Sequence, residues 1–270
     1  MDAKRRGADG GDRGGQSDND RVVPGLHPVR ELLRAHLAGR RPISPPRALW
    51  LASDRSTSPV LSEILELAAE AGVPVRERRR SQLDVLAEVS HQGVVAIAAP
   101  FHYLRLDELL EAVSAAETPL FVALDGVTDP HNLGSVARTA EALGAHGLIL
   151  PARRSASVGP AAEKAAAGAF SHLPVARVPN LTRALGDLAR NRIWTVGLAA
   201  TAALGVLDCD LLGEPVAIVV GAEGRGLSRL VTERCDALAS IEMRGQVGSL
   251  NASVAAALAL HEALRRRRPS

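Results

Sequence analysis

Hydrophobic side chains recur along this chain at two spacings, one typical of amphipathic helices and one of buried strands. In the N-terminal third, helical spacing predicts a first helix that begins near Gly25 and a second over residues 60–72. Short apolar runs predict strands over residues 48–51, 73–75 and 94–98. Residues 22–100 are therefore expected to form a small α/β domain, with enough residues to bury a core of its own.

The segments on either side of this domain differ from it in composition. Residues 1–21 are mostly Gly, Asp, Arg, Ser and Asn with almost no apolar side chain, so we expect a disordered tail. Residues 101–117 are acidic and contain several alanines at helical spacing. We expect them to form a helical linker between two domains.

A second alternation of strands and helices fills residues 118–268. The expected strands cover residues 120–124, 147–150, 193–197, 216–220 and 239–243, and the expected helices cover residues 133–143, 161–169, 181–190 and 250–268. Strands that alternate with helices predict an α/β domain with a mostly parallel sheet covered on both faces. The last helix places Leu250, Val254, Leu258, His261 and Leu264 on one face, among small alanines.

Composition narrows the possible partners. Only six of the 270 residues are aromatic, so a platform of rings that stacks single-stranded bases is nearly excluded. Of the 32 cationic side chains, 30 are arginine, which a GC-rich coding bias would also explain. A net charge of +2 and a pI near 8.8 permit nucleic-acid binding without requiring it.

The same survey argues against metal and membrane sites. Cys209 and Cys235 form no CxxC pair and have no neighbouring histidine, so a zinc site or a disulfide framework is not expected. No apolar run approaches the length of a membrane span, and the N-terminus carries no hydrophobic signal segment. We expect a cytoplasmic protein without a metal ion.

The first of three glycine-bearing loops covers residues 124–138 and leads from a predicted strand into a predicted helix. It places Asp125, Asn132 and Arg138 at the carboxyl end of a strand, where open α/β sheets bind ligands. A helix N-cap is the alternative interpretation of Asn132. We favour a functional role for Asn132 together with Arg138, and leave both interpretations open for Asp125 and Pro130.

The second and third loops carry further polar side chains between glycines. Residues 219–228 have the spacing G-x-x-G-x-G, which is neither the dinucleotide-binding pattern nor a Walker loop. Such glycines indicate close approach of the backbone to another group, and Glu223 stands between them. In the third loop, residues 241–254, Ser249 and Asn251 precede a helix, where capping and ligand binding are equally open.

Together these loops resemble the motifs of the SpoU (TrmH) family of the SPOUT superfamily of RNA methyltransferases. The strings D-G-V-T-D-P-H-N-L-G-x-x-x-R, G-A-E-G-x-G-L and I-x-M-x-G-x-x-x-S-L-N-x-S-V-A occur in the family's order and separation. Residues 23–29 and 91–96 resemble the N-terminal domain of its RlmB-type subgroup, which methylates the 2′-hydroxyl of a guanosine in 23S ribosomal RNA. The resemblance covers residues 22–268.

This resemblance implies a trefoil-knotted domain that holds S-adenosylmethionine, a homodimer packed through the knot and the last helix, and an N-terminal RNA-binding domain similar to ribosomal protein L30e. The implied catalytic and substrate-binding residues are Asn132, Arg138, Glu223, Ser249 and Asn251. The implied cofactor contacts are Leu198, Ala199, Gly221, Ile241 and Leu250. Two positions depart from the family: Glu242 replaces the usual Pro, and Ala252 replaces the usual Val.

Arginine is expected to carry RNA binding, because its planar guanidinium donates two parallel hydrogen bonds to phosphate. The candidates are Arg30, Arg34, Arg153 and Arg154. Arg138 matches the family's candidate base, but a guanidinium stays protonated, so we expect it to stabilise phosphate or a developing oxyanion. We expect Glu223 to hold either Arg138 or a loop amide.

Three alternatives remain open at this point. One is a tRNA 2′-O-ribose methyltransferase of the same family, and another is a non-catalytic RNA-binding protein of ribosome assembly on the same scaffold. The third, an NAD-dependent oxidoreductase, is disfavoured because the glycine spacing is wrong and no early strand leads into G-x-G-x-x-G.

Overall fold

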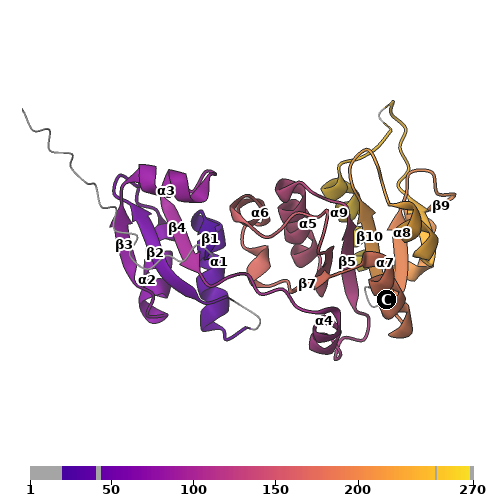
Figure 1. Cartoon of the computed structure of the whole chain (residues 1–270), viewed down its shortest axis with the longest axis horizontal. Helices are drawn as coiled ribbons and strands as arrows, with labels where there is room; N and C mark the ends of the chain where they lie inside the picture. Colours follow the sequence, from indigo (N-terminus) through magenta and orange to yellow (C-terminus); the bar gives the residue numbers. More distant parts are fainter. Residues whose placement is uncertain (1–19, 41–43, 247, 268–270) are drawn as a thin grey trace, which may run out of the picture.

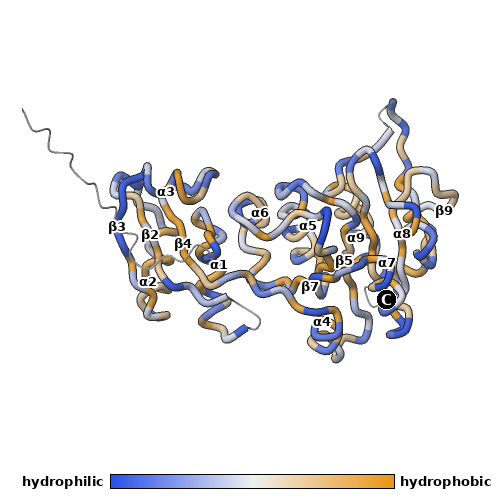
Figure 2. Tube along the Cα trace, viewed as in Figure 1, coloured by the Kyte–Doolittle hydropathy of each residue, from blue (hydrophilic) through white to orange (hydrophobic). Residues whose placement is uncertain are grey.

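The computed structural model describes residues 20–40, 44–246 and 248–267, which form two α/β units side by side (Figure 1). Residues 1–19 of the predicted tail lie outside the described residues. Arg21, its last residue, belongs instead to the first strand of the N-terminal unit. In both units the apolar stretches follow the strands and the helix faces turned toward them (Figure 2).

The N-terminal unit is a four-stranded sheet with helices on both faces. Its elements are β1 (Arg21–Pro24), α1 (Leu26–Leu37), β2 (Pro46–Ala52), α2 (Pro59–Glu70), β3 (Val75–Arg78), α3 (Arg80–Ala87) and β4 (Val94–Ala98). The strand order is β1-β4-β2-β3. Alternation along β2 sends Leu49 and Leu51 toward α1 and α2, and sends Trp50 toward α3.

The C-terminal unit is built on a seven-stranded sheet in which every described strand pair is parallel. Its strands are β5 (Leu120–Asp125), β6 (Gly147–Pro151), β7 (Val175–Val178), β8 (Trp194–Leu198), β9 (Leu204–Gly205), β10 (Val216–Gly221) and β11 (Ala237–Ser240). The order is β7-β6-β5-β10-β8-β11-β9. The predicted mostly parallel α/β fold is confirmed, whereas the trefoil knot stays a prediction.

Helices cover both faces of this sheet. They are α4 (Leu106–Ala112), α5 (Pro130–Ala142), α6 (Pro160–Ala166), α7 (Leu181–Arg190), α8 (Arg229–Arg234) and α9 (Ala252–Arg266). Helices α5, α6 and α9 pack in one core against one face, and α4, α7 and α8 pack in a second core against the other. Among the described helices, none is long and apolar enough to cross a membrane.

The predicted helical linker contains α4 and packs on the C-terminal unit. Leu109 of α4 is completely buried in the core of the C-terminal unit, and Leu104 forms a bridge with Ala176 of β7. Because the apolar side of this segment is covered by the sheet, residues 101–117 act as a structural part of the C-terminal unit.

Side chains from both units meet between β1, α1 and α6. The buried Arg21 of β1 donates from Nε to Oε1 of the equally buried Glu163 of α6, at 2.5 Å. Nε2 of His172, in the C-terminal unit, lies within hydrogen-bond distance of Oε2 of Glu31 of α1, at 3.1 Å. Two buried charges offset the cost of their desolvation only when their geometry is good. The Arg21–Glu163 pair therefore favours one arrangement of the two units.

Candidate functional site

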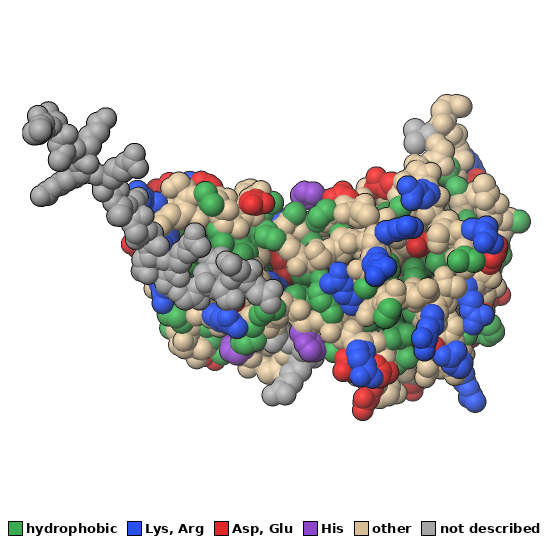
Figure 3. Space-filling view, viewed as in Figure 1, with side chains coloured by type: hydrophobic (Ala, Val, Ile, Leu, Met, Phe, Trp, Pro, Cys, Tyr) green, Lys and Arg blue, Asp and Glu red, His purple; other side chains and the backbone are tan. Residues whose placement is uncertain are grey.

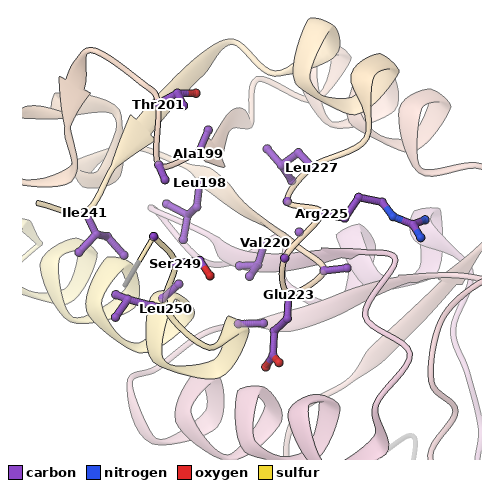
Figure 4. Close-up of a pocket in the computed structure, with 18 of the residues that line it drawn as sticks. Leu198, Ala199, Thr201, Val220, Glu223, Arg225, Leu227, Ile241, Ser249 and Leu250 are labelled. Carbon is purple, nitrogen blue, oxygen red and sulfur yellow. The ribbon is translucent and has the colours of Figure 1, made fainter. Parts of the chain in front are cut away.

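A pocket of about 430 Å³ opens at the carboxyl edge of the parallel sheet, on the side of β10 and β8 (Figure 4). Its walls come from the loops that follow β8, β10 and β11 and from the start of α9. This volume falls within the range of small-molecule sites, and the carboxyl edge is where open α/β sheets bind ligands.

All five residues predicted to contact the cofactor line this pocket: Leu198, Ala199, Gly221, Ile241 and Leu250. Leu198, Ile241 and Leu250 point into it from three different segments (Figure 4). The walls are therefore mainly aliphatic side chains and main chain, which suits a flat, partly apolar ligand. Their contact with a cofactor stays a prediction.

The second loop is folded tightly against the end of β10. A Cβ atom at Gly221 would lie 2.2 Å from the backbone carbon of Gly226, so no side chain fits there. The Gly226 N–H donates to the Ala222 carbonyl at 2.8 Å, which closes the loop. This close approach of backbone to backbone explains Gly221 in the G-x-x-G-x-G spacing.

One carboxylate joins the polar side chains of the three loops. Oε1 of Glu223 accepts from Nδ2 of Asn132 at 2.8 Å, and also accepts a short hydrogen bond from Nδ2 of Asn251. The Asn251 amide in turn donates to Oδ1 of Asn132 at 2.9 Å. Residues far apart in the sequence thus form one connected amide–carboxylate cluster beside the pocket.

The capping interpretation is wrong for Asn132 and right for Asn251. Asp129 is the N-cap of α5 and accepts from the His131 N–H at 2.9 Å, so the Asn132 amide is free to meet Glu223. Asn251 is the N-cap of α9 and accepts from the Ser253 N–H at 2.8 Å through Oδ1. Its Nδ2 group still reaches the cluster, so one side chain performs both tasks.

Asp125 has a structural role at the end of β5. Its Oδ2 accepts from the Ser228 N–H at 2.7 Å and so ties the end of the second loop to the strand. Register explains the contact, because Asp125 is paired with Gly221 where the two parallel strands end.

Two predicted polar residues stand apart from the cluster. Ser249 lines the pocket rim, and its hydroxyl forms no hydrogen bond within the described part of the chain. Arg138 is exposed on α5 outside the pocket, and it forms no ion pair or hydrogen bond with any described residue. Of the two partners expected for Glu223, Arg138 forms no hydrogen bond or ion pair with it. Glu223 instead holds the side-chain amides of Asn132 and Asn251.

The predicted RNA-binding arginines fall into two environments. Arg30 and Arg34 are joined to Glu31 and Glu63, so their charge is balanced on the surface of the N-terminal unit. Arg153 and Arg154 follow β6 at the same sheet edge as the pocket and are exposed. Figure 3 shows Lys and Arg side chains in a line across this face of the C-terminal unit.

Sequence reasoning did not single out Arg225. It lines the pocket from the second loop and carries its guanidinium outward (Figure 4). Its position between Gly224 and Gly226 was the available signal, because a cation flanked by loop glycines lies at the tip of the turn. The pocket is therefore lined by a cation that the sequence did not predict.

The two departures from the family motif leave the pocket intact. Glu242 is exposed and pairs with Arg244 at 2.9 Å, whereas its neighbours Ile241 and Met243 supply the pocket wall. Ala252 is buried at the start of α9 and lines the pocket floor. Among the described residues, no group of three or more His, Cys, Asp or Glu side chains is arranged to hold a metal ion.

Comparison with known proteins places these features in a family. The model of the SpoU rRNA Methylase family matches residues 119–261, and the model for RNA 2′-O ribose methyltransferase substrate binding matches residues 22–104. The chain is 43% identical over 250 residues to the 23S rRNA (guanosine-2′-O-)-methyltransferase RlmB of Pseudomonas putida, covering 91% of this chain and 96% of that protein.

Solved structures agree with this assignment. The SpoU methyltransferase AviRb of Streptomyces viridochromogenes, in complex with the cofactor AdoMet, has a TM-score of 0.74 and 28% identity, covering 92% of this chain and 91% of that one. The TrmH/SpoU tRNA modifying enzyme of A. aeolicus has a TM-score of 0.51 and 28% identity, covering 60% of this chain and 82% of its own. The chain belongs to the SpoU rRNA methylase family of RNA methyltransferases.

Proposed function

We propose that this protein transfers a methyl group from S-adenosylmethionine to the 2′-hydroxyl of a guanosine in 23S ribosomal RNA. One structural observation carries the proposal: Asn132, Glu223 and Asn251 form a connected polar cluster beside an aliphatic pocket at the carboxyl edge of the sheet. The RlmB relative, similar along nearly its whole length, supports the choice of ribosomal RNA.

The pocket residues fit S-adenosylmethionine. Leu198, Ile241 and Leu250 supply aliphatic surface for an adenine ring, and the loop at Gly221 exposes main chain where no side chain intervenes. S-adenosylmethionine, when bound, supplies a methyl group on a positively charged sulfur. Glu223 lines this pocket, and its negative charge would favour binding of such a cation.

The chain's own residues orient the ribose. The Glu223 carboxylate fixes the amides of Asn132 and Asn251, so both groups are held ready for the ribose hydroxyls. The Ser249 hydroxyl at the rim has no partner among the described residues, and we assign it to the reacting hydroxyl. A guanidinium is a hydrogen-bond donor and a cation, so we assign Arg138 to an RNA phosphate or the developing alkoxide rather than to proton removal.

We further propose a homodimer that uses the last helix. Val254 and Leu258 of α9 are 45% and 44% exposed, one helical turn apart, beside the wall of the pocket. Leu207, in the short 3₁₀ turn against α9, is 64% exposed. Exposed apolar side chains on one face of a helix, such as Val254 and Leu258, are typical of a protein interface. We also propose that the C-terminal unit contains a trefoil knot, as its family resemblance implies. We propose in addition that the protein is located in the cytoplasm.

RNA contacts follow from the distribution of unpaired charge. We assign the phosphates next to the target nucleotide to Arg153 and Arg154, which lie exposed at the carboxyl edge. We assign the remaining RNA to the N-terminal unit, in the manner of an L30e-like domain. Arg30 and Arg34 pair with carboxylates that are only 20% and 32% exposed, and such partly buried pairs give these arginines weaker support as RNA ligands.

The test is methyl transfer from labelled S-adenosylmethionine to purified 23S rRNA and to tRNA, with nucleoside analysis of the products. We expect 2′-O-methylguanosine from 23S rRNA, and expect Arg138→Ala to lower kcat by at least about a hundredfold while cofactor binding persists. Transfer to tRNA alone would replace the ribosomal assignment, since the catalytic unit resembles a tRNA-modifying enzyme. Cofactor binding without transfer to any RNA would favour a non-catalytic role.

A further inference from the structure

Lys164 occupies an unusual place in this arginine-rich chain. Only Lys4 and Lys164 are lysines among 32 cationic side chains, and Lys164 alone lies in the described residues. It projects from α6 of the C-terminal unit, and its Nζ donates to Oε1 of Gln92 in the N-terminal unit at 2.9 Å. Nζ also lies 2.8 Å from the position that a Cβ atom of Gly25 would take.

The two loops beneath this ammonium group have strained or left-handed backbones. Gly25 has φ +102° and Gly93 has φ +79°, and the non-glycine Gln92 has φ +54°. The Gly25 N–H donates to the Val94 carbonyl at 2.9 Å, which holds the two loops together. A non-glycine residue in this region costs about 1 kcal/mol or more and occurs preferentially at functional sites.

Two arginines lie against the same loop from the N-terminal unit. A Cβ atom at Gly93 would lie 3.0 Å from Cβ of Arg55 and 3.7 Å from Nη2 of Arg80. The Arg55 side chain and the Arg80 guanidinium therefore lie against Gly93, the residue next to Gln92, whose side chain accepts from Lys164. We name Arg55, Arg80 and Lys164, with the loops at Gly25 and Gln92–Gly93, the junction cluster.

The charge of the junction cluster is available to a ligand. Arg55 pairs with Glu77 at 2.9 Å and Arg80 pairs with Asp54 at 2.8 Å, but these carboxylates are 65% and 60% exposed. Exposed pairs of this kind contribute about 1 kcal/mol or less, so a phosphate can compete for the guanidinium donors. Lys164 forms no ion pair with any described carboxylate, and it uses one of its three N–H donors on Gln92.

The junction cluster also leads toward the proposed catalytic site. Helix α6, which carries Lys164, packs so closely on α5 that a Cβ atom at Gly134 would lie 2.4 Å from the Ala162 carbonyl. Asn132 of the amide–carboxylate cluster is two residues from Gly134 on the same helix. Helix α6 therefore connects the junction cluster to the helix that carries Asn132.

We propose that the junction cluster binds the sugar–phosphate backbone of the RNA substrate where it crosses from the N-terminal unit to the C-terminal unit. The inference rests on the proposed function, because that function supplies RNA as the polyanion. The Lys164 ammonium lies close to Gly25, and we expect the broader guanidinium of an arginine to fit there less well, which gives a physical reason for lysine at position 164.

The test compares Arg55→Ala/Arg80→Ala and Lys164→Ala with the wild-type protein in binding to a 23S rRNA fragment at several salt concentrations. We expect each variant to raise Kd and KM about fivefold or more, with kcat within about twofold. The slope of log K against log salt should fall by about 0.7 to 0.9 for each lost phosphate contact. Lys164→Arg should behave like Lys164→Ala, although it keeps the charge.

A matched control is Arg47→Ala, which removes one exposed, ion-paired arginine at the opposite end of β2. Equal weakening by Arg47→Ala would show unspecific attraction and overturn the proposal, as would unchanged RNA affinity in the double variant. The double variant lies wholly within the N-terminal unit, so it remains decisive if Lys164→Ala loosens the junction.

Failure of the proposed function gives a different result. In that case the wild-type protein would bind no S-adenosylmethionine or methylate no RNA, while RNA affinity would still depend on the junction cluster. Failure of the present inference would leave wild-type methylation intact and all variants equal in RNA affinity.

Discussion

Removal of the Glu163 carboxylate should leave a buried, unpaired cation between the two units. The side chains of Arg21 and Glu163 are only 3% and 1% exposed, and the face of the Phe101 ring, 4.8 Å from the Arg21 guanidinium, offers no counter-charge. Breaking a buried pair by removing one partner costs about 3–5 kcal/mol, because the remaining charge stays desolvated. We expect Glu163→Ala to destabilise the N-terminal unit by that amount.

The two tryptophans allow each unit to be followed separately during urea unfolding. Trp50 lies in β2 and Trp194 lies in β8, so Trp194→Phe and Trp50→Phe backgrounds report the N-terminal and C-terminal units respectively. With an m value of about 2 kcal/mol per M, the expected loss lowers the midpoint of the N-terminal unit by about 1.5–2.5 M urea. The C-terminal unit should then unfold at a higher concentration than the N-terminal unit.

Replacement of both partners is the matched control. Arg21→Met/Glu163→Leu removes both charges and keeps similar volume, so its stability should lie within about 1 kcal/mol of the wild-type protein. A Glu163→Ala variant that loses less than about 1 kcal/mol would refute this reasoning. It would show that water reaches the Arg21 guanidinium or that the units are joined in another way.

Four further perturbations test the site and its surroundings. Gly221→Ala should abolish S-adenosylmethionine binding measured by calorimetry, because its Cβ atom would lie 2.2 Å from backbone, whereas Gly245→Ala, with open space around it, should bind normally. Glu223→Gln should lower kcat by about tenfold or more, because it weakens the hydrogen bonds that hold two amides. Leu258→Asp should convert a dimer into a monomer in sedimentation analysis. Burial raises the pKa of Cys235 to about 12, so its reaction with a thiol reagent at pH 8 should be slow in the folded protein and fast after unfolding in urea.

The sequence pattern predicts the buried strands best. Residues 94–98 and 216–220 are continuous apolar runs, and the corresponding strands β4 and β10 differ from the prediction by at most one residue. Elements with few apolar positions were missed. Helix α3 buries only Leu83 and Ala87, and strand β9 has two residues, so neither leaves a periodic signal.

The candidate site could not be predicted in full from the spacing of apolar and polar residues along the chain. Asp129 and Asn132 are both suitable N-caps, and only the structure shows that Asp129 takes this role and releases Asn132 for Glu223. The strand order places β10 between β5 and β8, so loops separated by many residues meet at one edge. The family motifs predicted that these loops meet, whereas Lys164 lies in no such motif, and its contact with Gln92 is known only from the structure.

The central claim is tested most directly by mapping ribose methylation in 23S rRNA from cells with and without this protein. The account predicts that one guanosine loses its 2′-O-methyl group in cells that lack the protein. The wild-type chain should restore it, whereas Arg138→Ala should not. An unchanged methylation pattern in 23S rRNA, with or without a change in tRNA, would contradict the account.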